Sequence, residues 1–202
     1  SLGYPKAKFF EKDGFKWYEQ NTHTDYSFGI VTYKTGDEIY YTLATTADDK
    51  GYIGYAKKLL LKSAEKGYEK LFDEHKKIWK KYWAKSSVKT GDKLIDETYK
   101  KSWYLFKCCS KKGGYPMPLQ GVWTADNDCL PPWKGDYHHD TNTELSYQSY
   151  LKANRLEEGE AFIDYLWRLK PAYEKFAKGF FGVKGLLFPS CSTLDGKAMG
   201  GW

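Results

Sequence analysis

The chain has 202 residues, of which 41% are hydrophobic, 18% aromatic and 29% charged, a composition that predicts a folded globular protein and excludes a disordered one. Its formal charge of +6 comes mainly from lysines spread along expected helices, with no arginine-rich cluster or helix-turn-helix pattern, so we expect no nucleic-acid partner. The sequence has no run of about 18 apolar residues, so we expect no membrane span.

The first fifty residues have the composition of β-strands. Tyr26–Tyr33 and Glu38–Thr46 are rich in β-branched and aromatic residues, and Thr35–Asp37 between them supplies a turn, so the sequence predicts a hairpin. A third strand is expected at Phe15–Gln20, after a turn at Asp13-Gly14. Because an isolated hairpin is only marginally stable in water, we expect these strands to pair outside the chain or to pack on the following helices.

The pattern changes to a helical period after residue 51. His75 lies on an apolar helical face, where we expect a histidine buried in the core. The expected helices are two within Tyr52–Trp83, separated at Gly67, and then Lys93–Cys109, Thr143–Asn154 and Glu157–Lys178, the last with a kink at Pro171. The tail, Leu186–Trp202, has the composition of a loop.

A long loop is expected at Leu119–Asp140, which is dense in Trp, Pro, Gly and Asp. Loops longer than about 15 residues in a folded domain are usually functional or disordered. Trp123 and Trp133 lie in this loop and favour an ordered, functional segment. Tryptophan rings are flat apolar surfaces with a polar edge, which suits stacking on a sugar ring, so these two residues are candidate walls of a sugar site.

The segment Pro131–Tyr147 holds the candidate chemical groups. If Tyr137–Asn142 is extended, the side chains of His138, Asp140 and Asn142 project to the same side. A carboxylate, an amide and an imidazole placed together can hold a water molecule and polarise it for attack on an electrophilic carbon. The sequence therefore predicts a water-activating site here.

Two other interpretations of this segment remain open at this point. Thr141 and Glu144 have the T-x-x-E spacing of a capping box, which would fix the backbone at the start of a helix and is compatible with a site. His138, His139 and Asp140 would be the members of a metal site, but adjacent histidines normally point apart. The four cysteines lack metal-ligand spacing, so we predict no metal and no cofactor.

Three sequence motifs resemble glycoside hydrolase family 95 and its relatives. The motifs correspond to the family pattern LQGxW, PPW and NxNxE, and they are Leu119–Trp123, Pro131–Trp133 and Asp140–Glu144. His75-x-x-x-Trp79-x-x-x-Trp83 is similar to the helix that joins the family's β-sandwich to its barrel. The resemblance covers most of residues 26–202 and implies an α+β chain with a β-sandwich, a linker and an (α/α)6 barrel.

The resemblance also implies a domain division. Residues 1–50 would be the last strands of the sandwich, residues 51–88 the linker helices, and residues 89–202 the first helices of the six-hairpin barrel. About three barrel helices are expected here, whereas the whole barrel has twelve. We therefore expect the chain to be a fragment whose partner is the remainder of the barrel in the full-length protein, with the general acid beyond Trp202.

Members of the resembled family remove terminal α-L-fucose or the corresponding L-galactose with inversion. The family's two water-activating asparagines fall on Asp140 and Asn142, and its substrate-contacting histidine falls on His138. Trp123 and Trp133 would shape the pocket. The first asparagine is replaced by Asp140, which either acts directly as the base or marks a subfamily with a different sugar.

The expected activity is therefore that of an incomplete glycosidase acting on an oligosaccharide or glycoconjugate, and the resemblance favours a secreted or periplasmic location. Two rival hypotheses remain open. A non-catalytic carbohydrate-binding protein would bind sugars without cleaving them, and a helical interaction scaffold would do neither.

Overall fold

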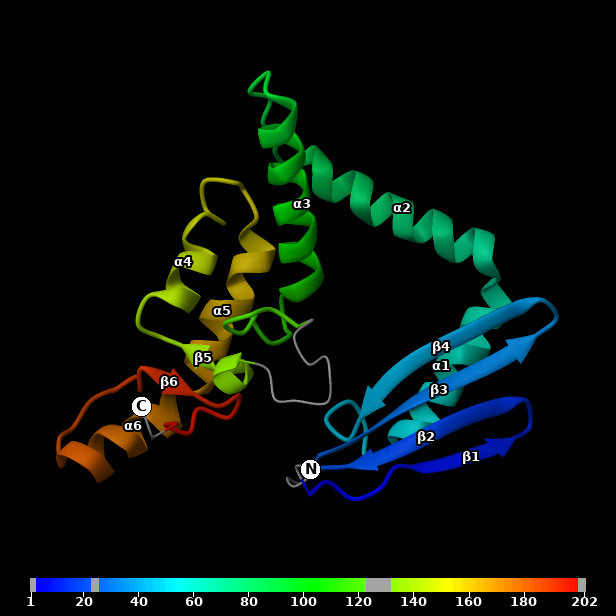
Figure 1. The fold of residues 1–202 in the computed structure, drawn as a ribbon, viewed down its shortest axis with the longest axis horizontal. Helices are drawn as coiled ribbons and strands as arrows, with labels where there is room; N and C mark the ends of the chain where they lie inside the picture. The colour runs from blue at the N-terminus through cyan, green and yellow to red at the C-terminus, as the bar shows by residue number, and fades with distance from the viewer. Residues whose placement is uncertain (1–2, 23–25, 123–131, 200–202) are drawn as a thin grey trace. The chain divides into compact units, whose positions relative to one another are not determined.

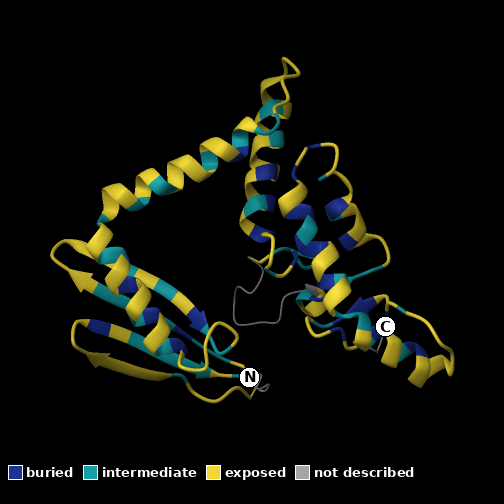
Figure 2. Ribbon diagram, turned by 180° about the vertical axis from the view of Figure 1, so that it is seen from behind, coloured by how far each residue is buried: buried dark blue, intermediate teal, exposed yellow. Residues whose placement is uncertain are grey.

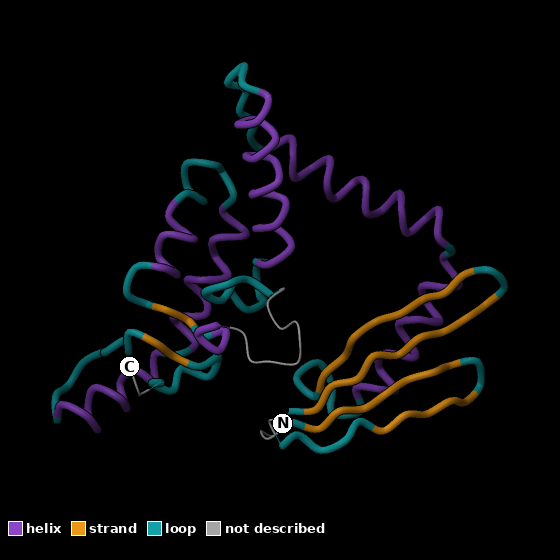
Figure 3. Tube along the Cα trace, viewed as in Figure 1, coloured by secondary structure: helices purple, strands orange, loops and turns teal. Residues whose placement is uncertain are grey.

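The computed structural model describes residues 3–22, 26–122 and 132–199, and the chain divides into two units, Ser1–Tyr82 and Trp83–Trp202. The first unit contains a four-stranded antiparallel sheet, and the second consists mostly of helices (Figures 1 and 3). The fold class is therefore α+β, as predicted. Trp123 lies outside the described residues.

The sheet of the first unit follows the chain order, β1-β2-β3-β4. Its strands are β1 (Lys8–Lys12), β2 (Phe15–Asn21), β3 (Ser27–Thr35) and β4 (Glu38–Thr45). The Asp13-Gly14 turn has positive φ angles of 52° and 77°, which suit a two-residue hairpin loop. The predicted hairpin and third strand are confirmed. Strand β1 was not predicted, because all five of its residues are exposed and show no alternation of apolar and polar positions.

Helix α1 (Tyr52–Lys66) covers one face of this sheet and supplies the packing that the strands need. The buried core between them is formed by Phe15, Val31, Ala44, Tyr52, Ala56 and Leu60. The close approach depends on Gly29 in β3, where an added β-carbon would lie 2.7 Å from the Ile53 side chain of α1. The structure thus shows the second expected alternative, in which the strands pack on the helix that follows them.

Helix α2 (Tyr68–Ala84) begins after Gly67, which has a positive φ of 75° and separates the two helices as predicted. Its predicted apolar face is largely exposed, since Ile78 is 60% exposed and the buried residue of this helix is Tyr82. His75 is also exposed and lies edge-on to Trp79, so the prediction of a buried histidine is wrong. The reason is that the described residues do not cover this face.

The second unit contains four α-helices within its described residues, followed by a short π-helical turn. They are α3 (Lys93–Cys109), α4 (Asn142–Gln148), α5 (Leu156–Arg168), α6 (Lys170–Phe176) and η2 (Ala177–Phe181). Helix α3 has the predicted bounds, and the expected kink near Pro171 is a break between α5 and α6 at Leu169. Helix α4 ends six residues before its predicted end, because the chain continues as turns to Asn154, whose φ of +53° is left-handed.

Aromatic side chains from α3, α4 and α5 form the core of the second unit, and Figure 2 shows the buried positions along these helices. The core residues are Trp103, Phe106, Tyr137, Tyr147, Ala153, Phe162 and Tyr165. A partly buried ion pair of 2.6 Å between Lys107 and Glu158 also joins α3 to α5. This packing fixes the helices against which the candidate site is built.

Two short strands complete the second unit. β5 (Tyr137–His138) pairs antiparallel with β6 (Cys191–Ser192), and the turn η1 (Pro132–Gly135) precedes β5. The tail was predicted to be a loop, but it contains β6. This strand was missed because two residues are too few to show a period in the sequence. A search of the described helices finds none with the length and apolarity to cross a membrane.

Candidate active site

Strand β5 determines where the histidine of the candidate site lies. Tyr137 pairs with Ser192 and His138 with Cys191 across the two-stranded ladder. Tyr137 points into the core, where its hydroxyl donates a hydrogen bond of 2.9 Å to the Pro116 carbonyl oxygen. Because side chains alternate along a strand, His138 projects to the other side.

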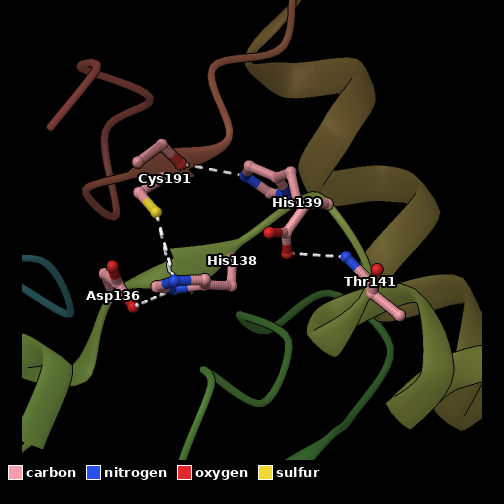
Figure 4. A network of polar contacts seen from close by, with 7 residues as sticks. Asp136, His138, His139, Thr141 and Cys191 are labelled. Carbon is pink, nitrogen blue, oxygen red and sulfur yellow. Dashed lines mark hydrogen bonds and ion pairs between the residues drawn. The ribbon is translucent and has the colours of Figure 1, made fainter. Parts of the chain in front are cut away.

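His138 contacts three side chains there, and Figure 4 shows two of them, Asp136 and Cys191. Its Nδ1 lies 2.8 Å from Oδ1 of Asp136, and its Nε2 lies 3.3 Å from Sγ of Cys191. Burial raises the pKa of the Cys191 thiol, and the nearby Asp136 carboxylate adds to this effect. The third contact is Trp133, whose ring stands edge-on to the imidazole with the ring centroids 5.6 Å apart. His138 is therefore held in one orientation by polar and aromatic neighbours.

Trp133 has an unusual backbone conformation. Its φ is +58°, and that of Lys134 is +61°, in the left-handed region that bulky side chains rarely adopt. Such strain tends to occur where a side chain is held for function. The indole is 50% exposed, so one part of it contacts His138 and the rest faces solvent. Trp133 is therefore in contact with His138, and its role as a wall of the site stays a prediction.

The prediction of an extended segment from Tyr137 to Asn142 is wrong. The strand ends at His138, the following residues form a turn, and Asn142 is the first residue of α4. Strand alternation therefore cannot place His138, Asp140 and Asn142 on one side. The His139 N–H donates a hydrogen bond of 2.7 Å to the Ser190 carbonyl oxygen. The chain then turns, and α4 begins three residues after His139.

Asp140 and Asn142 are nevertheless both exposed at the start of α4, and neither is sealed beneath packed side chains. Oδ1 of Asp140 accepts a hydrogen bond of 2.6 Å from the Thr141 N–H. This bond is the largest cause of a lowered pKa for Asp140, and the charge of His138 contributes in the same direction. Asp140 is thus a carboxylate at neutral pH.

The predicted capping box is also wrong in its hydrogen bonds. Thr141 is the N-cap residue of α4, but its side chain makes no capping hydrogen bond. The side chain of Asp140 accepts from the backbone at this helix start instead. The T-x-x-E pattern therefore predicted where the helix begins but not which side chain stabilises its first turn.

The two adjacent histidines point apart, as expected (Figure 4). Nε2 of His139 lies 2.9 Å from the Ser192 hydroxyl and 3.4 Å from that of Tyr173. Burial lowers the pKa of His139, which keeps its imidazole neutral at neutral pH. His139 therefore belongs to the packing beneath the site, and the structure does not join it to His138 and Asp140 in a metal cluster.

The residues that sequence reasoning missed are Asp136 and Cys191. Asp136 is 3% exposed and lies two residues before His138, so its position on the same side of the chain was a usable signal. Cys191 lies 53 residues from His138 in the sequence, and nothing in the local pattern predicts that they meet.

With this geometry described, the comparison with family models decides the class of the protein. The model of the glycosyl hydrolase family 95 catalytic domain matches residues 46–200. The chain belongs to glycosyl hydrolase family 95. No curated protein and no solved structure gave a match.

Family 95 membership confirms the resemblance seen in the motifs and makes the protein a glycosidase, a hydrolase with a carbohydrate substrate. The matched span contains α1 to α6 and both strands of the small ladder. Trp133, His138, Asp140 and Asn142 therefore all lie within the catalytic domain of a family 95 enzyme.

Proposed function

We propose that this family 95 chain supplies the water-activating side of an inverting site that removes a terminal α-L-fucoside or a related α-L-galactoside. Asp140 acts as the base, Asn142 orients the water, and His138 binds sugar hydroxyl groups. Trp133, with Trp123, shapes the pocket. The general acid comes from the remainder of an (α/α)6 barrel in the full-length protein.

The same proposal includes the domain division given by the motifs. Residues 1–50 belong to a β-sandwich, residues 51–88 form linker helices, and residues 89–202 begin the barrel. The antiparallel sheet in the first unit and the helices in the second are compatible with this division.

The observation that carries the proposal is the state and position of Asp140. Its lowered pKa keeps it ionised, and its side chain is exposed. Asn142 lies two residues further on and is the first residue of α4. An inverting glycosidase needs such a carboxylate to take a proton from water on the face of the sugar opposite the general acid, with about 6.5–9.5 Å between the two groups.

The aspartate at position 140 simplifies the chemistry that the family pattern implies. A carboxylate accepts a proton far better than an amide, so Asp140 serves as the base without help from a distant residue. The Asn142 amide can both donate and accept hydrogen bonds, which suits it to orient the attacking water. The contact between Trp133 and His138 orients the imidazole that is proposed to bind the substrate.

The test replaces Asp140 by alanine in the full-length protein and measures hydrolysis of aryl α-L-fucosides and α-L-galactosides. We expect kcat to fall by about 10²- to 10⁴-fold, because the base is lost, while the melting temperature changes little for an exposed side chain. Asp164→Ala removes another exposed aspartate, on α5, and is the matched control.

Unchanged turnover in Asp140→Ala would remove Asp140 from the mechanism. Equal losses in Asp140→Ala and Asp164→Ala would show that the effect comes from charge or folding rather than from the base. Sugar binding without hydrolysis by the unaltered full-length protein would contradict the proposed reaction.

A further inference from the structure

Asp136, His138 and Cys191 form a cluster of three potential metal ligands from two separate segments of the chain. One ligand atom from each residue lies within 4.8 Å of the other two. Asp136 and His138 come from the segment around β5, and Cys191 comes from β6. Among the described residues, this is the group of three that could hold one ion. Figure 4 shows the carboxylate, imidazole and sulfur facing one another.

The carboxylate of Asp136 gives an independent reason to expect a ligand. Its side chain is fully buried, and only one of its oxygens, Oδ1, is bonded to His138. Within the described part of the chain, Oδ2 is buried and has no hydrogen-bond partner. A buried carboxylate oxygen without a partner is costly, and coordination of a cation is one way to remove that cost.

The charges of the cluster match a divalent ion. An ionised Asp136, a Cys191 thiolate and a neutral His138 together carry two negative charges. A bound divalent cation would neutralise both, and the proton of the thiol would leave to solvent. No lysine or arginine pairs with Asp136 among the described residues, so these charges have no other cationic partner there.

The ligand atoms select zinc among common divalent ions. Thiolate and imidazole ligands favour zinc over magnesium or calcium, which prefer oxygen ligands. Zinc bonds of about 2.3 Å to sulfur and 2.0–2.1 Å to nitrogen place neighbouring tetrahedral ligands about 3.6 Å apart. Sγ of Cys191 lies 3.3 Å from Nε2 and 3.6 Å from Nδ1 of His138, so a rotation of one of these side chains is needed to bring the sulfur and an imidazole nitrogen onto the same ion.

We infer that Asp136, His138 and Cys191 bind one zinc ion through three protein ligands, with a fourth position left to water. The antiparallel pairing of His138 with Cys191 holds two of the ligands on adjacent backbones before the ion arrives. Zinc binding then links β5 to β6 through side chains as well as through the ladder. This differs from the sequence prediction of no metal, which rested on the spacing of the cysteines and on the adjacent histidines.

The inference concerns the same His138 to which the proposed function assigns sugar binding, and a zinc ion on this imidazole would take that role from it. Metal binding is measured directly, so its outcome is independent of the hydrolysis assay. The full chain is purified without metal, and Zn²⁺ is titrated against it by calorimetry. Co²⁺ is added in a parallel experiment, because a cobalt–thiolate bond gives a charge-transfer absorption that other ligands do not. We expect one equivalent of Zn²⁺ to bind with a Kd below about 1 μM, and we expect the cobalt band to appear.

The variants Cys191→Ser, His138→Ala and Asp136→Asn should each weaken Zn²⁺ binding by about 10- to 100-fold or more. Cys108→Ser removes an exposed free cysteine and His75→Ala removes an exposed histidine, so both controls should bind zinc as the unaltered chain does. Circular dichroism checks that each variant is folded.

Unchanged zinc affinity in Cys191→Ser would overturn the inference, as would the absence of a cobalt–thiolate band in the unaltered chain. The cobalt spectrum needs no variant, so it decides the matter even if a buried substitution prevents folding. Loss of binding in Cys108→Ser with retention in Cys191→Ser would assign the metal to another site.

Discussion

At the scale of single residues, the site combines an exposed acid with a strained aromatic residue. Trp133 adopts a left-handed conformation and contacts His138, whereas Asp140 is held by a backbone hydrogen bond at the next turn of the chain. Neither feature is visible in the residue types alone. The tryptophan was a candidate because of its chemistry, and the structure adds the contact that orients it.

Trp133 is expected to affect substrate binding more than the chemical step. In the full-length protein, Trp133→Ala should raise KM by about 3- to 10-fold with little change in kcat, because ring stacking on a sugar is worth about 0.5–1.5 kcal/mol. Trp167→Ala removes a more exposed tryptophan on α5 and is the control. An unchanged KM in Trp133→Ala, measured by steady-state kinetics, would exclude this role.

Asp96 provides a test of the pH dependence of stability away from the site. The pKa of Asp96 is lowered chiefly by hydrogen bonds from the backbone and side chain of Thr90, both at 2.8 Å. Because the folded state binds this proton less readily than the unfolded chain, Asp96 contributes stability above about pH 4, and the contribution is lost as the pH falls through the lowered pKa.

Thermal unfolding of Asp96→Asn should therefore give a lower melting temperature than the unaltered chain at pH 6, with the difference shrinking below about pH 4. Asp164→Asn measures the effect of losing an exposed helical carboxylate and serves as the comparison. A difference that is constant between pH 6 and pH 3 would show that the hydrogen bonds to Thr90 do not favour the ionised form.

At the scale of elements, two helix starts that look alike in sequence differ in their capping. The side chain of Asp92 accepts from the N–H groups of Leu94 and Ile95, at 2.8 and 3.2 Å, and caps α3. Thr141 precedes α4 in a T-x-x-E pattern but makes no such bond. A residue type that is common at N-caps precedes each helix, whereas the hydrogen bonds depend on the backbone conformation, which is extended at Asp92 and not at Thr141.

Alanine substitution at the two N-cap positions should therefore give different results. Asp92→Ala should destabilise the chain by about 1 kcal/mol in denaturant unfolding, because two N–H groups lose their acceptor. Thr141→Ala should change the free energy of unfolding by less than about 0.5 kcal/mol. Equal losses in both variants would show that the Thr141 side chain caps α4 in solution.

The elements that could be predicted are those whose own sequence carries the signal. Helix α3 has a regular apolar period and a capping aspartate, and its predicted bounds are confirmed. The turn at Asp13-Gly14 needed only its two residue types. In contrast, β5 and β6 are two residues each and depend on their pairing; the extended segment expected from Tyr137 contains β5 but overestimates its length, and β6 was not predicted.

At the scale of the whole molecule, the family could be predicted from local sequence motifs, whereas the arrangement of the site depends on residues far apart in the sequence. The motifs around Trp133 and Asp140 were sufficient to predict family 95, which the match over residues 46–200 confirms. The approach of Cys191 to His138 depends on how a distant tail folds back on β5. The extended geometry predicted for the site failed for a local reason, because the chain turns after His138 and α4 begins at Asn142.

The most direct test of the account is chemical rescue of Asp140→Ala with azide in the full-length protein. Azide needs no base, so it should replace the activated water, attack the sugar as the aryl group leaves, and restore turnover of an aryl α-L-fucoside or α-L-galactoside. We predict a glycosyl azide of inverted configuration, identified by nuclear magnetic resonance. Absence of rescue, or a glycosyl azide of retained configuration, would contradict the role of Asp140 as the base.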